Sequence, residues 1–375
     1  MTDTGSTRKK RLRSGFTTGA CAAAAAKAAC LQLLGGAAGH EVSIPFPDGT
    51  RHRFAVLAGL RLGNGQARAS VLKDAGDDPD VTNGAEIGVW LTMADGPGPE
   101  QLTVRYEAGE GVGTVTKPGL AVAVGEPAIN PMPRRMIEAA LLEALAECTA
   151  EGNAPPYGRP LLMTVSIFIP KGRELAQKTL NERLGIVGGL SILGTTGIVR
   201  PVSAEAWTAT ILASMAVARE MGCREIVLST GRTSEKAVQG LLGLPVEAYA
   251  MMGDYLHFSL SAARDFAFQR VHLAGMWAKV LKAAMAIPQT HVRHGALEVA
   301  AAATFVGRLA GSEPLARELA DANTAREIYD RLIASGRQDL ITGVCTAARR
   351  YAEETTQRPV TVYLVTSATQ VVCHV

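Results

Sequence analysis

Four aspartates stand within a short segment that directly follows a strand-like run: Asp74, Asp77, Asp78 and Asp80. Carboxylates this close repel one another, so at least one of them tends to hold a proton, to bind a cation or to be neutralised by the neighbouring Lys73. The segment therefore predicts a proton acceptor or a cation site. An exposed acidic turn is the alternative. The spacing matches no EF-hand and lacks the closing glutamate.

A second group of chemically useful residues opens the first predicted helix, residues 20–34. Thr17, Thr18 and Gly19 precede this helix, whose first amides have no partners within it, and the glycine lets an anion or a carbonyl come close to them. Ordinary capping by Thr18, with Cys21 as a small packing residue, explains the same pattern equally well. No base is identified beside Cys21, so we do not expect it to be a nucleophile.

Residues 107–113, with the sequence EAGEGVG, imitate the acidic and glycine-rich start of a dinucleotide or S-adenosylmethionine site. Such a site needs a helix next, whereas residues 114–119 are β-branched residues followed by proline. A glycine-rich turn that faces a ligand is the interpretation that remains.

The second half of the chain offers a better ligand site. A predicted strand, residues 225–229, leads into Thr230 and Gly231 and then into a helix, and the next strand ends just before Asp254. Ligands of doubly wound sheets bind beyond the carboxyl ends of the strands, where an acidic residue after the second strand accepts hydrogen bonds from ribose hydroxyls. Asp254 fits this role, and it also fits the N-cap of the following helix.

Histidines are the remaining candidate ligands, at positions 257, 272, 291 and 294. His291 and His294 are spaced to share one helical face, but no third ligand is placed near them, and zinc usually needs three or four. We therefore predict no metal held by the protein.

The length of the chain indicates how many domains hold these candidate residues. A chain of 375 residues, at roughly 150 residues per domain, predicts about two domains. The first half alternates short β-like runs with turns, flanked by helices at residues 20–34 and 134–150. It predicts an N-terminal α+β domain with a mixed sheet over residues 1–170, of which 1–11 form a disordered basic tail. Over residues 171–375 strands and helices take turns, which predicts a Rossmann-like, three-layer α/β domain with a parallel sheet. The chain as a whole is thus of the α/β class.

Composition excludes several functions. Hydrophobic residues at 47% and charged residues at 19% exclude a disordered chain, and a net charge of +3 argues against nucleic-acid binding. The longest weakly polar stretch, residues 20–38, contains Lys27 and is rich in alanine, so no membrane span is expected. Six scattered cysteines without a CxxC pair, and no signal sequence, indicate a reduced, cytoplasmic protein.

Several motifs resemble those of one family. They are LRSGFTTGACAAAAAKAA at residues 12–29, KDAGDDPDVT at 73–82, GTVTKPGL at 113–120, GEPAINP at 125–131, GLSILGTTGIVRP at 189–201 and MGDY at 252–255. Together they resemble the CbiD family of cobalt-precorrin-5B C1-methyltransferases. The resemblance implies an enzyme of the oxygen-independent branch of cobalamin synthesis. It would move the methyl group of S-adenosylmethionine to C1 of cobalt-precorrin-5B and yield cobalt-precorrin-6A.

The implied reaction suggests roles for the candidate residues. We expect Thr230, Gly231 and Asp254 to bind S-adenosylmethionine, and Asp77 or Asp78 to accept the proton lost from the ring. The macrocycle carries many carboxylates, so basic residues and helix N-termini should bind it, and we assign this to Thr17, Thr18, Gly19, Lys117 and Arg200. Cobalt arrives only as part of the substrate.

Two other classes of function stay open at this point. One is a tetrapyrrole-binding or chaperoning protein without turnover. The other is a nicotinamide-dependent oxidoreductase, disfavoured because no GxGxxG follows a strand and opens a helix. We expect neither nucleic acid nor a membrane as a partner, and the sequence leaves self-association into a homo-oligomer open.

Overall fold

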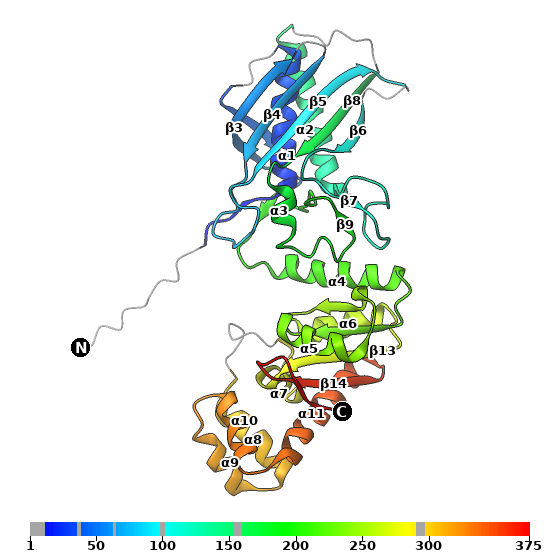
Figure 1. Ribbon diagram of the computed structural model, residues 1–375. Coiled ribbons are helices and arrows are strands. Elements are labelled where there is room, and N and C mark those ends of the chain that lie inside the picture. Colours follow the sequence, from blue (N-terminus) through cyan, green and yellow to red (C-terminus); the bar gives the residue numbers. More distant parts are fainter. Residues whose placement is uncertain (1–11, 36–38, 63–64, 98–101, 153–159, 290–296) are drawn as a thin grey trace, which may run out of the picture. The chain divides into compact units, whose positions relative to one another are not determined.

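The computed structural model describes residues 12–35, 39–62, 65–97, 102–152, 160–289 and 297–375 (Figure 1). By its internal contacts the chain divides into two compact units, Met1–Ser203 and Ala204–Val375. Strands and helices mix in both, so the expected α/β class is confirmed. The basic tail, residues 1–11, lies outside the described residues.

The first unit is built on a six-stranded mixed sheet. The strand order is β2-β3-β4-β5-β8-β6, with β6 and β8 parallel and the other neighbours antiparallel. The strands of this sheet are β2 (Glu41–Pro45), β3 (Arg51–Leu62), β4 (Gln66–Leu72), β5 (Glu86–Asp95), β6 (Leu102–Ala108) and β8 (Leu161–Phe168). Side chains alternate along the strands, and in β5 Ile87, Val89 and Leu91 are fully buried while Trp90 is exposed.

Two helices, α1 (Thr18–Leu34) and α2 (Pro131–Ala150), pack together, and α1 contacts strands β2 to β5 (Figure 1). Helix α1 is buried on all sides, with its alanines from Ala20 to Ala29 fully buried. Such a helix forms because alanine has the highest helix propensity, and its small side chain lets neighbouring elements come close. It ends at Gly35, whose φ of 77° is left-handed.

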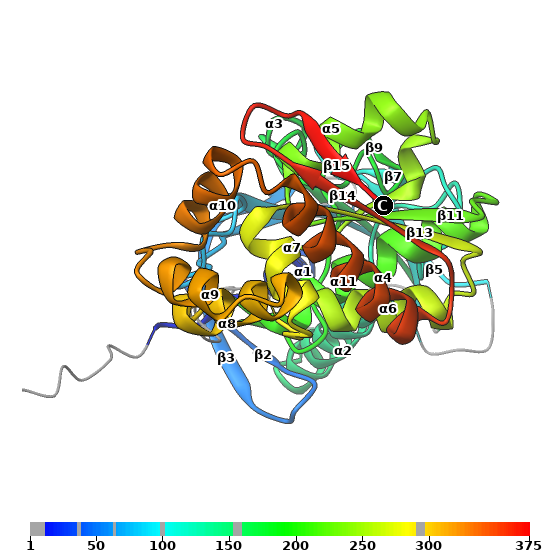
Figure 2. The ribbon, with the colours of Figure 1, turned by 90° about the horizontal axis from the view of Figure 1, so that it is seen from below.

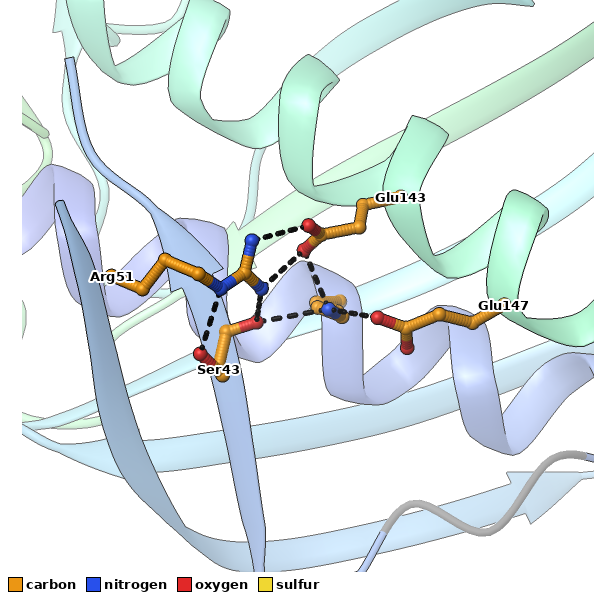
Figure 3. A network of polar contacts seen from close by, with 5 residues as sticks. Ser43, Arg51, Glu143 and Glu147 are labelled. Atoms are coloured by element: carbon orange, nitrogen blue, oxygen red, sulfur yellow. Dashed lines mark hydrogen bonds and ion pairs between the residues drawn. The ribbon is translucent and has the colours of Figure 1, made fainter. Parts of the chain in front are cut away.

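One charged residue interrupts the apolar surface of α1. The Lys27 ammonium group donates to Glu143 and Glu147 of α2, at 2.6 and 2.7 Å, and to the carbonyl oxygen of Ser43, at 2.9 Å. Arg51 of β3 donates to the same Glu143 carboxylate, as Figure 3 shows. The network ties α1, α2 and the β2–β3 hairpin together.

Short elements complete the first unit and explain where it ends. They are β1 (Gly15–Phe16), β7 (Thr114–Val115), α3 (Gly172–Ala176), β9 (Ile186–Val187) and β10 (Ile198–Val199). Strand β9 pairs with β7, and β10 pairs with β1. The segment from 171 to 203 therefore belongs to the first unit. A division after residue 170, which the sequence led us to expect at Pro170, would separate these strand pairs.

The second unit has a five-stranded sheet of order β12-β11-β13-β14-β15. The strands are β11 (Glu225–Ser229), β12 (Tyr249–Met251), β13 (Arg270–Met276), β14 (Val360–Val365) and β15 (Val371–His374). The first four are parallel, and β15 is antiparallel to β14. The predicted parallel sheet is present, with an antiparallel strand added at one edge.

Helix α4 (Ala204–Glu220) precedes the first strand of this sheet. The helices between the strands are α5 (Arg232–Leu242), α6 (Leu256–Asp265), α7 (Trp277–Ala284), α8 (Val299–Ala310), α9 (Glu313–Ala320), α10 (Ala325–Ala334) and α11 (Gln338–Thr356). Helix α11 packs on α7, α6 and α8, α10 packs on α7, and α9 packs on α8 (Figure 2). A 3-10 turn, Val246–Ala248, directly precedes β12, so the strand that the sequence predicted just before Asp254 has only three residues.

Candidate functional site

The acidic loop, which we define as residues 73–84, is held by β1 and by the residues that flank the β1–β10 pair. The Asp77 carboxylate accepts a hydrogen bond from the Arg13 amide at 2.7 Å, and the Asp77 amide donates to the Arg13 carbonyl at 2.8 Å. The Asp78 carboxylate accepts from the Val202 amide at 2.8 Å. Asp77 is exposed and Asp78 half-buried. Both predicted proton acceptors thus lie on one loop, fixed by backbone donors from distant segments.

The other two aspartates of the loop have structural partners. The Asp74 carboxylate accepts hydrogen bonds from the two terminal nitrogens of the Arg13 guanidinium group. Asp80 pairs with the buried Lys73 at 2.7 Å. Burial alone would raise the pKa of Asp80, but the charge of Lys73 and hydrogen bonds from Lys73 and Thr82 outweigh it and lower this pKa. Among the described residues no group of three His, Cys, Asp or Glu is placed to hold a metal ion.

Thr17, Thr18 and Gly19 are all buried and bond to other parts of the protein. Thr17 caps α1, because its side chain accepts from the Ala20 amide at 3.2 Å; the cap is thus Thr17 and not Thr18. The Thr18 hydroxyl accepts from the Leu193 amide at 2.9 Å, and the Gly19 amide donates to the Leu193 carbonyl at 3.0 Å. These residues hold the start of α1 against the segment before β10.

Cys21 follows in the first turn of α1 and is fully buried. Burial raises the pKa of its thiol to about 12. A thiol in this state is almost wholly protonated near neutral pH, which agrees with the expectation that Cys21 is no nucleophile.

The glycines of the 107–113 motif serve close backbone packing. A side chain at Gly111 would meet the Ile169 carbonyl oxygen at 2.0 Å, and one at Gly113 would meet the Ile186 side chain at 2.5 Å. Gly111 also has a φ of 72°. At these two glycines the space that a side chain would fill is therefore taken up by the chain itself.

Lys117 and Arg200 lie in different parts of the first unit. Lys117, half-buried, follows β7 and donates to the Arg183 carbonyl at 3.1 Å. Arg200 is exposed and directly follows β10, the strand that pairs with β1. The structure thus brings Thr17, Thr18, Gly19, Asp77, Asp78 and Arg200 around the β1–β10 pair, whereas Lys117 lies at the β7–β9 pair. Sequence reasoning missed Arg13 here, although it stands in the first family motif.

In the second unit Thr230 and Gly231 follow the carboxyl end of β11. The Gly231 amide donates to the Ser234 hydroxyl at 3.2 Å, so Ser234 fixes this turn at the start of α5. A side chain added at Gly231 would meet nothing within 4 Å, so the turn borders open space. A helix start of this kind presents amides and a positive dipole end to a ligand.

Asp254 lies after β12, at the same edge of the sheet, as the sequence predicted. Its carboxylate forms an ion pair with Lys279 of α7, which follows the carboxyl end of β13. The predicted N-cap role is not observed, because α6 begins at Leu256 with Tyr255 as its N-cap residue. Three neighbouring strands, β12, β11 and β13, therefore deliver Asp254, Thr230 with Gly231, and Lys279 to one edge. Lys279 was not predicted, since only the strand order places it here.

Of the four candidate histidines, His257 and His272 form hydrogen bonds with other side chains. His257 contacts the Tyr351 hydroxyl at 3.0 Å, and the buried His272 lies between Glu225, at 2.7 Å, and Tyr363, at 3.1 Å. His291 and His294 lie outside the described residues. Within the described part of the chain no helix has the length and apolar character needed to span a bilayer.

Comparison with known proteins defines the class to which this two-unit α/β protein belongs. The family profile described as CbiD matches residues 5–201, and the one described as CbiD, C-terminal domain, matches residues 289–374. The chain belongs to the CbiD family.

Among its relatives are proteins named cobalt-precorrin-5B C(1)-methyltransferase. The one from Desulfotalea psychrophila is 54% identical over 97% of this chain and 98% of its own. The one from Geobacter sulfurreducens is 48% identical over 92% of each chain. A solved structure titled cobalamin biosynthesis protein (cbiD), from Archaeoglobus fulgidus, covers 84% of each chain at 24% identity with a TM-score of 0.37.

Proposed function

We propose that this protein transfers the methyl group of S-adenosylmethionine to C1 of cobalt-precorrin-5B, giving cobalt-precorrin-6A and S-adenosylhomocysteine in cobalamin synthesis. The observation that carries this proposal is the identity of 54% to a protein of that name over nearly the whole of both chains. We place the enzyme in the cytoplasm, with the macrocycle as its partner.

The methyl donor would bind to the second unit, which we regard as Rossmann-like. Its parallel strands have the order β12-β11-β13-β14, which is the strand order of doubly wound folds. In such an order the chain continues from β11 to one side of the sheet and from β12 to the other, so a ligand can bind at the carboxyl ends of β11 and β13. Asp254 is placed to accept hydrogen bonds from ribose hydroxyls. The turn of Thr230 and Gly231 would receive the carboxylate of the amino-acid part at the start of α5.

The first unit would bind the macrocycle, whose acetate and propionate groups call for cationic side chains. Arg200 is exposed beside the β1–β10 pair, and Lys117 lies at β7–β9. Thr17, Thr18 and Gly19 are buried, so we now assign them the task of holding α1 and the segment before β10 in place rather than that of touching the substrate.

In the reaction a ring carbon, made nucleophilic by conjugated nitrogens, attacks the methyl carbon. A carbon–carbon bond forms as the sulfur–methyl bond breaks, and the electron pair stays on sulfur. Alignment and exclusion of water do most of this work. The proton that the ring loses would go to Asp77 or Asp78, whose carboxylates are held in place by the amides of Arg13 and Val202.

The purified protein should convert cobalt-precorrin-5B only when S-adenosylmethionine is supplied. With a donor labelled with carbon-13 in its methyl group, the product should carry one labelled methyl at C1, seen by NMR and by mass. Binding of the macrocycle without turnover would support the binding-protein alternative. Consumption of NADH without methylation would support the oxidoreductase alternative.

A further inference from the structure

Trp207 lies beside the candidate donor site, at the turn that carries Asp254. It stands in the first turn of α4 and donates its indole N–H to the carbonyl oxygen of Met252 at 3.2 Å. Met252 directly follows β12, and its own amide continues the ladder by donating to Ser229 of β11 at 2.9 Å. The indole is thereby fixed to the carboxyl edge of the sheet.

The neighbouring glycine shows how closely the ring approaches this turn. A side chain at Gly253 would lie 2.8 to 2.9 Å from Cζ2, Cε2 and Nε1 of Trp207, which is too close for a carbon atom to fit. Gly253 also has a φ of 58°, which favours glycine. The indole therefore packs directly on the backbone that precedes Asp254.

Much of the indole nevertheless remains accessible. Trp207 is 44% exposed, whereas Trp277, the other tryptophan of this unit, is 5% exposed. The indole N–H already donates a hydrogen bond within the protein, so the exposed part of the ring is apolar and forms no strong interaction with water. Its open surface suits a flat, apolar partner.

The chemistry of the donor supplies such a partner. The base of a nucleoside is bonded to C1′ of the ribose, next to the carbon that carries the 2′-hydroxyl. If Asp254 binds the ribose hydroxyls, the base must lie within a few ångströms of Asp254, where Trp207 is fixed. We propose that Trp207 stacks on the adenine ring of S-adenosylmethionine and so selects a purine nucleoside at this site. This inference depends on the proposed use of S-adenosylmethionine.

A purely structural role predicts something different. If Trp207 only clamps the Met252–Gly253 turn, a ligand at the sheet edge would not contact the indole and would leave its fluorescence unchanged. Stacking on a purine, in contrast, changes the emission of the ring itself. Trp90 provides a matched control, because it is also partly exposed, at 37%, but lies in the first unit on strand β5.

The experiment titrates S-adenosylhomocysteine into wild type, Trp207→Phe, Trp207→Ala and Trp90→Phe, following tryptophan emission and, by calorimetry, Kd. Base–aromatic stacking is worth about 1–3 kcal/mol, so Trp207→Ala should raise Kd by about 5- to 150-fold. Trp207→Phe keeps a ring and should stay within about threefold of wild type. The ligand-induced change in emission should persist in Trp90→Phe and disappear in Trp207→Phe.

Two results would overturn the inference. One is binding to wild type with an emission change that survives in Trp207→Phe. The other is an unchanged Kd in both Trp207 variants. A wild-type protein that binds no S-adenosylhomocysteine, and no S-adenosylmethionine, would instead reject the proposed function together with the inference. 5′-Methylthioadenosine, which keeps the base and ribose, should give the same Trp207-dependent change in emission.

Discussion

The ammonium nitrogen of Lys27 lies 2.6 Å from a carboxylate oxygen of Glu143, and the lysine side chain is only 3% exposed. Lys27 is thus a buried cation in the middle of an alanine-rich helix, compensated from a neighbouring helix. Removing a charge from water is costly, and such a residue is tolerated because three acceptors surround the ammonium group.

Replacing Lys27 with methionine should destabilise the first unit by about 2–4 kcal/mol. The variant fills a similar volume but leaves Glu147 and the Ser43 carbonyl without their buried donor, and Glu143 with Arg51 as its remaining cation. Urea unfolding followed by circular dichroism measures the change. Arg317→Ala is the control, because its pair with Glu313 is exposed on both sides and should cost less than about 1 kcal/mol. Equal effects of the two substitutions would contradict the assignment.

The Glu143 carboxylate should make the free energy of unfolding depend on pH. The hydrogen bond from Arg51, with the hydrogen bond and charge of Lys27, lowers the pKa of Glu143 from 4.5 to about 2. A depressed pKa in the folded state stabilises the protein above the unfolded pKa, and this contribution, up to about 3 kcal/mol, is lost as the pH falls from about 4.5 towards 2. The difference in unfolding free energy between wild type and Glu143→Gln should therefore shrink from pH 6 to pH 3.5. A constant difference over that range would argue against it.

Asp78→Asn should slow methyl transfer while substrate binding is kept. The amide oxygen of asparagine still accepts the Val202 hydrogen bond, so the loop should keep its position, but no carboxylate remains to take the proton. General-base contributions are typically 100- to 10,000-fold, and we expect a loss of about that size in kcat with little change in KM. Asp77→Asn tests the alternative base in the same assay. Full activity in both variants would remove the acidic loop from the chemistry.

Asp254→Ala should weaken the binding of S-adenosylhomocysteine by about 10- to 100-fold, because hydrogen bonds to a charged group contribute about 1.5–3 kcal/mol. The ligand-dependent rise in Tm should fall accordingly. Asp265→Ala is a suitable control, since this aspartate is exposed at the end of α6 and pairs with Arg264. If both variants show the wild-type shift in Tm, Asp254 is not part of the donor site.

Local patterns in the sequence predicted most of the regular elements. Alanine propensity indicated α1, short β-like runs between turns indicated the strands of the six-stranded sheet, and the bounds of β11 were predicted correctly. The two-residue strands β1 and β10 were not predicted. Their pairing depends on a partner far along the chain, and no periodicity exists over two residues. The unit boundary was misplaced for the same reason.

For the candidate sites, the residue types were easier to predict than their surroundings. Asp254 lies at the carboxyl edge of the sheet because it follows the end of β12, a strand parallel to β11. The partners Lys279 and Trp207 come from separate helices and carry no signature of their own in the sequence. Thr17 and Thr18, at the start of α1, were assigned to a ligand, whereas their hydroxyls accept hydrogen bonds from the amides of Ala20 and Leu193. Burial of these hydroxyls depends on tertiary packing.

The register in which Gly15 faces Val199 has a consequence for synthesis on the ribosome. Strand β1 emerges early, but its partner is made only after nearly all of the first unit has been translated. The β1–β10 pair, and the hydrogen bond from the Val202 amide to Asp78, therefore cannot form until residues 198–202 have left the exit tunnel. Contacts so distant in sequence close late and slow folding.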